Sequence, residues 1–386
     1  MRSIKYLISI LLLLTVTLGL SLYNELAFSW IDTDESTAIS LNLNEVASPS
    51  DYGLDETVLA EMVEQAANGY WGNIDSIHIV RNGQLVLAEY LRNYNGTRPH
   101  AMFSATKSVT SMLIGIAIEQ GFIESVDQKM MEFFPDYDLS TVRNPDDRKA
   151  GITLEHLLMM KSGIQWDEWS TRYGTPSNPT YKMVASRDWI QFMLDQPMDS
   201  EPGTKWTYNS GVTVLLSGII LNATGLNVRD FAQEYLFGPL GIEGSIWEAA
   251  PNNIFNTGWG LHLKPEDMLK LGFLSINDGM WEGEKIVSND WLDQSTQLHQ
   301  VRSANYGYGY QWSMFAMNTL EGHTPSQDDV PVATGYGSQK IYLLDQFDMV
   351  VTMTGENYQG APRLIDTIIH EYIVPAITNV DLESAN

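Results

Sequence analysis

Ser104 and Lys107 are the residues in this sequence whose types and spacing first suggest chemistry. They stand in "MFSATKSVTSMLIGIAIEQG", residues 102 to 121, whose pattern predicts a helix. Residues three apart on a helix are neighbours on its surface, and a serine hydroxyl beside an amine can act as a nucleophile beside its base. The alternative is a serine that caps the helix start, with a solvated lysine one turn further on. The spacing alone does not distinguish these two interpretations.

The rest of this segment favours a buried lysine. Val109, Met112, Leu113, Ile116 and Ala117 recur at the spacing of a core-facing stripe. The opposite side carries Ser104, Lys107, Ser108, Ser111 and Gly115, whereas a solvated face would be rich in charged residues. We therefore expect this side to face protein or a cleft, where desolvation favours the neutral amine that a base requires.

Two later segments change the balance between these interpretations. In "PGTKWTYNSGVTVLL", Tyr208 precedes Asn209, Ser210 and Gly211, and in "ATGYGSQKIYLL", Gly335 and Gly337 lead into a predicted strand. Alone, the tyrosine is more simply a packing aromatic and the glycines suit a turn. Together with the Ser-x-x-Lys spacing, in this order, they indicate an acyl-transfer site.

The elements that must position these residues alternate between strands and helices. A helix is expected over 54 to 68, and Asn82-Gly83 joins two predicted strands as a hairpin. The segment from about 105 to 250 is mostly helical, with Thr153 as a cap and Gly163 as a stop. Strand patterns return late, with a turn at Asp345 to Asp348, and a final helix is expected over 361 to 377. The pattern predicts an α+β fold whose antiparallel sheet joins both ends of the chain.

Over residues 54 to 375 the sequence resembles the serine β-lactamase-like family, which includes class C β-lactamases, D-alanyl-D-alanine carboxypeptidases, esterases and 6-aminohexanoate-dimer hydrolases. The segments that carry the resemblance are Ser-x-x-Lys, "ITLEHLLMMKSGIQWDE", "EPGTKWTYNSG", "GWGLHLKPEDMLKLGFL" and "YGYGYQW". Tyr-Asn-Ser-Gly is most similar to the 6-aminohexanoate-dimer hydrolase branch. The resemblance implies a β-lactamase/transpeptidase-like fold, with a sheet part at about 54–103 and 255–375 and a helical part at about 104–254.

The resemblance also implies roles for individual residues. Ser104 would be the nucleophile, Lys107 its base and Tyr208 the acid/base partner, with no cofactor and no metal. The backbone N–H groups of Ser104 and Ser338 would stabilise the oxyanion. Candidate substrate-binding residues are Ser210, Gly335, Tyr336, Gly337, Asp167, Glu168 and Tyr173. The aromatic residues of "IQWDEWSTRYG" are expected to be core or cleft wall, or else a lid beside the nucleophile.

Two departures from the lactamase pattern bear on the substrate. Gly335-Tyr336-Gly337 replaces Lys-Thr-Gly, so the cation that would pair with a β-lactam carboxylate is missing, and strand alternation prevents Lys340 from replacing it. Ser210 stands where the pattern has Asn. We therefore expect a serine hydrolase of small esters or short linear amides; the alternatives are a β-lactamase, a D-Ala-D-Ala carboxypeptidase or a non-catalytic penicillin-binding-type sensor.

Composition excludes several classes of function. The 386 residues carry a net charge of −26 and include no cysteine, which disfavours nucleic-acid binding and excludes disulfides and thiolate sites. The seven histidines show no metal-ligand spacing. We expect a small-molecule substrate, and the sequence leaves the oligomeric state open.

The first residues predict a targeting segment. Arg2 and Lys5 precede an apolar run to about Leu22, which suits a signal peptide or membrane anchor over residues 1–24. Residues 25–53 are expected to be a linker and 376–386 a tail. The folded part is then expected outside the cytoplasm, periplasmic or secreted, and attached to the inner membrane if the leader is not cleaved.

Overall fold

The computed structural model describes residues 39–316, 326 and 329–378. The expected leader, the first part of the expected linker and most of the expected tail lie outside these residues. Residues 39–53 are not a free linker: the backbone of Asn42 exchanges hydrogen bonds with Gly83 and Leu85 of the hairpin, at 2.7 and 3.1 Å, and a short 3-10 helix follows at Pro49–Tyr52.

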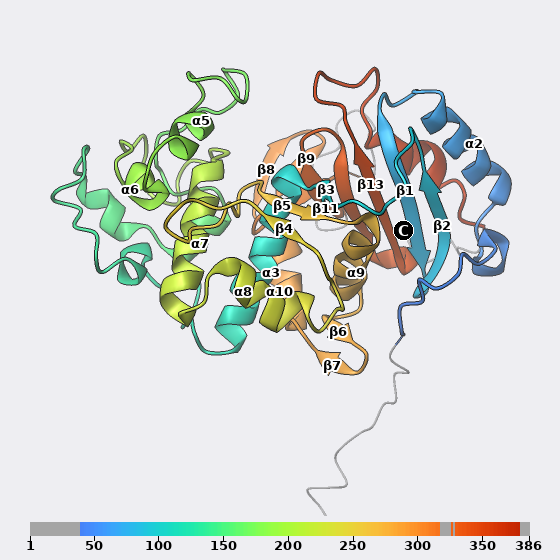
Figure 1. Cartoon of the computed structure of the whole chain (residues 1–386), viewed down its shortest axis with the longest axis horizontal. Coiled ribbons are helices and arrows are strands. Elements are labelled where there is room, and N and C mark those ends of the chain that lie inside the picture. Colours follow the sequence, from blue (N-terminus) through green and yellow to red (C-terminus); the bar gives the residue numbers. More distant parts are fainter. Residues whose placement is uncertain (1–38, 317–325, 327–328, 379–386) are drawn as a thin grey trace, which may run out of the picture. The chain divides into compact units, whose positions relative to one another are not determined.

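An eight-stranded antiparallel sheet dominates one part of the chain (Figure 1). Its strand order is β2-β1-β13-β12-β11-β10-β9-β8, so the N-terminal hairpin pairs with the last strand, as the sequence predicts. The strands are β1 (Ile74–Arg81), β2 (Gln84–Tyr90), β8 (Gln300–Ser303), β9 (Tyr306–Tyr308), β10 (Ser313–Phe315), β11 (Val330–Gly335), β12 (Gln339–Leu344) and β13 (Met349–Gly355).

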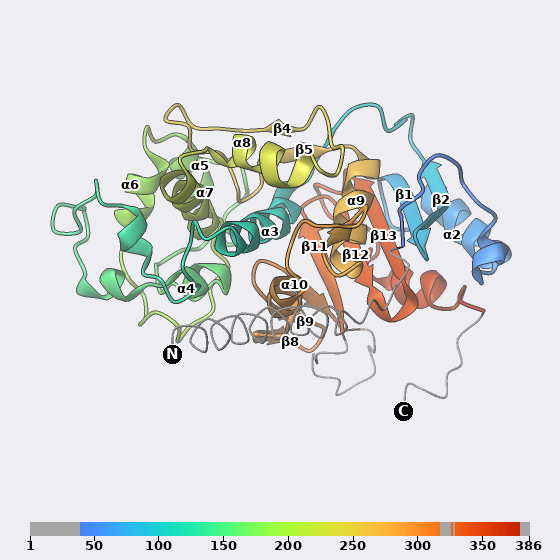
Figure 2. The ribbon, with the colours of Figure 1, turned by 90° about the horizontal axis from the view of Figure 1, so that it is seen from below.

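Alternating side chains of these strands enter two separate hydrophobic clusters. Ile341 and Leu343 belong to one cluster, and Tyr342 and Leu344 belong to the other, as the twofold period of a strand requires. Helix α9 (Pro265–Ile276) packs on the first face through Gly272, which lies against Val350 and Ile341. Helix α2 (Glu56–Ala67) and the C-terminal segment cover the second face (Figure 2).

The helical part lies in sequence between β3 (His100–Ala101) and β5 (Leu261–Leu263). Its helices are α3 (Thr106–Glu119), α4 (Leu154–Leu158), α5 (Pro179–Val184), α6 (Trp189–Leu194), α7 (Ser210–Thr224) and α8 (Val228–Ala232). Helix α10 (Asn289–Thr296) packs on α3, where Trp291 lies against Gly115 and donates to the carbonyl of Ser111 at 3.0 Å. Both sides of α3 are therefore buried from Thr106 to Ala117, which confirms that its charge-poor side faces protein.

Small strands connect the two parts. Strand β5 (Leu261–Leu263) pairs with β3 (His100–Ala101) and with β4 (Ile246–Trp247), and β6 (Met280–Trp281) pairs with β7 (Glu284–Lys285). The amide of Met102 then donates to the carbonyl of Leu261 at 2.8 Å, which fixes the chain directly before Ser104.

Two helix predictions are wrong in extent. Thr153 caps α4 with a capping box, but that helix ends at Leu158, well before Gly163. The final helix does not span 361–377: helical structure begins at residue 367 and continues as a π-turn at Ile369–Ile373. Directly before it, the carboxylate of Asp366 accepts from Lys340 and Tyr342 of β12.

The described residues contain no single helix that is long and apolar enough to cross a bilayer. Helix α7 together with Val228–Phe237 reaches that length and composition as a pair bent by 75°.

Candidate active site

Ser104 lies in a 3-10 turn, Phe103–Ala105, directly before α3, and Lys107 lies in the first turn of α3. Lys107 Nζ is 3.1 Å from Ser104 Oγ. Neither the turn nor α3 has a side-chain cap at its start, and Lys107 is 2% exposed. The alternative of a capping serine and a solvated lysine is therefore wrong.

Lys107 Nζ has two further oxygen partners. It lies 3.0 Å from Ser210 Oγ, at the first residue of α7, and 2.7 Å from the backbone oxygen of Gly258. It also lies 4.9 Å from the ring centroid of Tyr208. The structure thus brings Ser104 and Lys107 together with Tyr208 and Ser210, which lie about a hundred positions further along the sequence.

Tyr208 lies in a stack of aromatic rings. The ring of Trp169 is parallel to it, with centroids 5.1 Å apart and an interplanar angle of 18°, and Trp206 lies 6.2 Å away. The guanidinium of Arg302 lies 4.4 Å from the centroid of Trp206, and burial lowers the pKa of Arg302. Trp169 belongs to the "IQWDEWSTRYG" loop, so this loop does lie beside the catalytic candidates.

Glu168 of the same loop is buried, with 2% of its surface exposed. Its Oε1 accepts from Ser210 Oγ at 2.8 Å and from the Tyr173 hydroxyl at 2.9 Å. Its Oε2 accepts from the Ser210 amide at 2.8 Å and from Trp166 Nε1 at 2.6 Å. Burial and the charge of Glu168 raise the pKa of Tyr173.

Asp167 has a different role from its neighbour. Its carboxylate accepts from the amides of Trp169 and Ser170 at 3.1 and 3.0 Å, so it organises the loop. It is not among the residues that line the cavity at Ser104.

A cavity of about 410 Å³ opens beside Ser104. It is lined by predicted and unpredicted residues: Phe103, Ser104, Glu168, Tyr173, Gly174, Thr180, Tyr181, Val184, Ser210, Trp259 and Tyr336. Three of them, Thr180, Tyr181 and Val184, lie on α5, where no sequence pattern indicated a site. Trp259 and its neighbour Gly258 stand in the "GWG" segment that supported the family resemblance, although no role was assigned to them.

Gly335-Tyr336-Gly337, the segment that replaces Lys-Thr-Gly, leads from the end of β11 into the turn before β12. Tyr336 enters the cavity wall, with its ring 5.8 Å from Tyr173 and 5.7 Å from Phe103. Gly337 and Ser338 have positive φ, 83° and 78°, and Ser338 Oγ accepts from Asn357 at 2.9 Å. Gly335, Gly337 and Ser338 are not among the lining residues.

Lys340 lies away from the cavity. Its ammonium donates to Asp366 at 2.6 Å, in a buried ion pair between β12 and the C-terminal segment. A substrate carboxylate in the cavity has no access to this charge.

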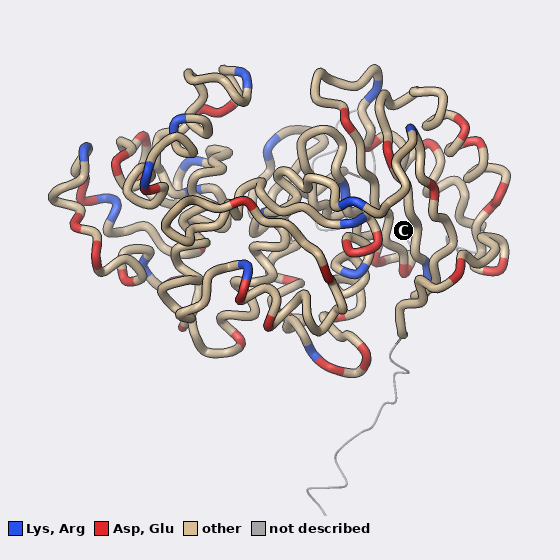
Figure 3. Tube along the Cα trace, viewed as in Figure 1, with Lys and Arg blue, Asp and Glu red and all other residues tan. Residues whose placement is uncertain are grey.

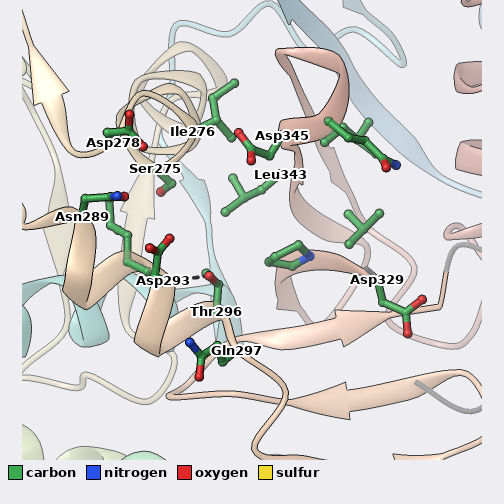
Figure 4. Close-up of a pocket in the computed structure, with 15 residues that line it drawn as sticks. Ser275, Ile276, Asp278, Asn289, Asp293, Thr296, Gln297, Asp329, Leu343 and Asp345 are labelled. Atoms are coloured by element: carbon green, nitrogen blue, oxygen red, sulfur yellow. Dashed lines mark hydrogen bonds between the residues drawn. The ribbon is translucent and has the colours of Figure 1, made fainter. Parts of the chain in front are cut away.

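A second cavity of about 440 Å³ lies between α9, α10 and the β11–β12 strands (Figure 4). Asp278, Asp293, Asp329 and Asp345 contribute to its lining. Burial, together with the charges of Asp348, Asp278 and Asp293, raises the pKa of Asp345. Its lining includes none of the predicted catalytic or substrate-binding residues, several of which line the cavity at Ser104.

The acidic charge of the chain is not concentrated at the site. Figure 3 shows acidic positions along both the helical part and the sheet part. At the site itself, one carboxylate, that of Glu168, lies in direct contact with Ser210, which in turn contacts Lys107.

Comparison with known proteins identifies relatives of this chain. A 6-aminohexanoate-dimer hydrolase of Paenarthrobacter ureafaciens is 24% identical over 231 residues, which cover 56% of this chain and 55% of that protein. An ML-236A carboxylate methylbutanoyltransferase of Penicillium citrinum is 28% identical over 153 residues, covering 37% of this chain and 36% of that protein. The chain thus spans between about a third and just over half of the length of these relatives.

A solved structure of a putative 6-aminohexanoate-dimer hydrolase from Bacillus anthracis superposes with a TM-score of 0.67 at 21% identity. The match covers 82% of this chain and 81% of that structure, and it confirms the predicted fold. Residues 59–359 match the family model described as Beta-lactamase. The chain belongs to the beta-lactamase family.

Proposed function

We propose that this protein is a serine hydrolase that forms an acyl-enzyme at Ser104 and acts on small neutral carboxylic esters, with short linear amides as slower substrates. The observation that carries the proposal is the position of Lys107 Nζ, 3.1 Å from Ser104 Oγ at the wall of a cavity. A nucleophile and a base at this distance are the pair that acyl transfer requires.

In the proposed reaction, Ser104 Oγ attacks the ester carbonyl while its proton passes to Lys107. The carbonyl oxygen becomes an oxyanion, which accepts from the backbone N–H of Ser104 and from a second N–H in the β11–β12 turn. Ser338 remains the predicted second donor, and Tyr336 of the same turn lines the cavity. The bond to the alkoxide then breaks, and the alcohol leaves with the proton that Lys107 received, passed on through Tyr208. A water molecule next attacks the acyl carbonyl and gives its proton to the same pair; the bond to Ser104 Oγ breaks, Ser104 Oγ recovers that proton, and the acid is released.

The lining of the cavity favours neutral substrates. Among its described lining residues the one formal charge is that of Glu168, whose carboxylate already accepts from four donors. Lys340 is paired with Asp366, and Arg302 lies over Trp206. A β-lactam carboxylate would therefore enter without a counter-charge, whereas aromatic and aliphatic side chains favour an apolar acyl or alcohol group.

The setting of Ser210 favours esters over amides. Its hydroxyl is already engaged with Lys107 and Glu168, so it offers no free group to hold a substrate amide. An alkoxide also leaves more readily than an amine.

The test is covalent labelling together with turnover. The purified protein is treated with a fluorophosphonate probe, the modified residue is located by mass spectrometry, and hydrolysis of p-nitrophenyl esters is followed. We expect modification of Ser104 and multiple turnovers. Labelling without turnover would favour a non-catalytic sensor, and the absence of both would reject the proposal.

A further inference from the structure

The hydrogen bonds around Glu168 assign a direction to the Ser210 hydroxyl. In its ionised form a carboxylate has acceptor positions and no donor. Two N–H groups point at Oε2 and two hydroxyl groups lie at Oε1. With Ser210 Oγ 2.8 Å from Oε1, the Ser210 hydrogen points at Glu168, and its lone pairs are left for Lys107.

The direction at Ser210 in turn fixes the direction at Lys107. In the neutral form that the proposed reaction requires of its base, the Lys107 amine has two N–H donors and one lone pair. The backbone oxygen of Gly258, at 2.7 Å, can only accept and takes one N–H. Ser210 Oγ, at 3.0 Å, has already used its hydrogen on Glu168 and takes the other.

One neighbour then remains for the lone pair of Lys107, and it is Ser104 Oγ at 3.1 Å. We infer that Glu168, acting through Ser210, is a positioning residue that directs the lone pair of neutral Lys107 at the hydroxyl of Ser104. This inference rests on the proposed function, because it concerns the base of that reaction. The proton moves from Ser104 Oγ to Lys107 Nζ, and Glu168 gains and loses none.

The inference gives Glu168 a role different from substrate contact. Glu168 touches the cavity, but its four acceptor positions are filled by protein groups. A third group that orients the base recurs in other serine hydrolases, where its loss leaves the base in the wrong state for accepting the proton.

Glu168→Gln is the sharpest test because it preserves the size of the side chain and replaces the acceptor that faces Ser210 with a hydrogen-bond donor. The two N–H donors at Oε2 require the amide oxygen there, so the amide nitrogen faces Ser210 Oγ and Tyr173. That nitrogen donates to Ser210, the Ser210 hydrogen turns toward Lys107, and the Lys107 lone pair accepts it. Lys107 then presents an N–H to Ser104 instead of a lone pair.

We expect Glu168→Gln to lower kcat for a p-nitrophenyl ester about 100-fold, because the base loses its orientation. KM should stay within about threefold of wild type, because glutamine keeps the size of the side chain in the cavity wall and the ester is neutral. The rate of Ser104 labelling by the fluorophosphonate probe should fall by a similar factor. Ser210→Ala removes the oxygen that accepts from Lys107 and should lower the labelling rate about tenfold. This variant tests the inference if Glu168→Gln does not fold.

Asp366→Asn is the matched control. Asp366 is also a buried carboxylate, 1% exposed, that accepts from Lys340, Tyr342 and Tyr306. Its loss should lower the melting temperature but leave the labelling rate within about twofold of wild type.

The outcomes separate the two proposals. If wild-type protein is not labelled at Ser104, the proposed function fails. If wild type is labelled and folded Glu168→Gln or Ser210→Ala is labelled at the same rate, the hydrolase stands and the positioning role is rejected. A fall in labelling that Asp366→Asn reproduces would also reject it, because the effect would then be one of stability.

Discussion

Gly335, the last residue of β11, packs directly against the backbone oxygen of Met102, two residues before Ser104. A side-chain carbon at position 335 would overlap that oxygen. The sheet and the nucleophile turn thus meet at a glycine, although the two residues are far apart in the sequence. Close approach of two backbones is a reason for glycine in a strand.

Gly335→Ala should therefore disturb the nucleophile turn. We expect the free energy of unfolding to fall by about 1–3 kcal/mol, as for overpacked sites, and kcat to fall with it. Urea denaturation and ester hydrolysis measure the two effects. Gly151→Ala is the control, because a Cβ there meets no atom within 4 Å; equal effects of both changes would contradict the contact.

Ser104→Ala should abolish labelling by the fluorophosphonate probe and lower kcat/KM for esters at least about 1000-fold, because the acyl-enzyme cannot form. Ser108→Ala is a matched control one turn further on, since Ser108 Oγ donates to the backbone oxygen of Gln311 and does not line the cavity. The Ser108→Ala protein should still be labelled at Ser104 by the fluorophosphonate probe. Labelling that persists in Ser104→Ala would place the nucleophile elsewhere.

Substrate preference should follow the charge of the cavity. On one preparation, kcat/KM should be highest for a short-chain p-nitrophenyl ester, lower for a linear 6-aminohexanoate dimer and a D-Ala-D-Ala peptide, and lowest for nitrocefin. The physical reason is the absence of Lys and Arg among the described lining residues. A nitrocefin value of about 10⁶ M⁻¹s⁻¹, which lies within the range of efficient enzymes, would contradict this reading.

Val184 should limit the length of the group that the cavity accepts. It lines the cavity from the end of α5 and is 47% exposed. Val184→Phe should lower kcat/KM for long-chain esters about tenfold relative to short-chain esters, because one or two lost methylene contacts are worth that factor. Val301→Phe, at a valine that is 42% exposed outside the lining, should leave the ratio unchanged.

His78 should make stability depend on pH. It is fully buried in β1, and burial lowers its pKa to about 4 from an ordinary value of 6.5. Between about pH 4 and 6.5 the unfolded chain therefore binds a proton at His78 that the folded chain does not. The contribution of His78 to the free energy of unfolding is fully present above about pH 6.5 and is lost as the pH falls toward 4. The loss approaches roughly 3 kcal/mol at the lower limit.

The measurement is urea denaturation of wild type and His78→Phe at pH 7.5 and pH 5. The difference in unfolding free energy between the two proteins should shift in favour of the variant at pH 5. A difference that is the same at both pH values would show that His78 contributes nothing to the pH dependence.

The fold class and the candidate catalytic residues could be predicted from local sequence patterns and the family resemblance. The hairpin at Asn82-Gly83, the helix that begins near Lys107 and the helix cap at Thr153 all follow from local patterns, because turn residues, caps and apolar spacing act over a few neighbouring positions. The proximity of Ser104 and Lys107 could also be predicted from their spacing, although Ser104 lies in the 3-10 turn directly before α3 and not in the helix itself.

The groups that surround these candidates could be identified only in the folded chain. The partners of Lys107 are Ser210 and Gly258, and the partners of Ser210 include Glu168; no local pattern contains such contacts. Asp167 and Glu168 are adjacent in the sequence but have different partners: Asp167 accepts from an amide of its own loop, and Glu168 accepts from the amide of Ser210. This difference could not be predicted from the sequence. Burial and hydrogen-bond partners depend on which segments the fold brings together, so the role that we infer for Glu168 could be argued only from the folded chain.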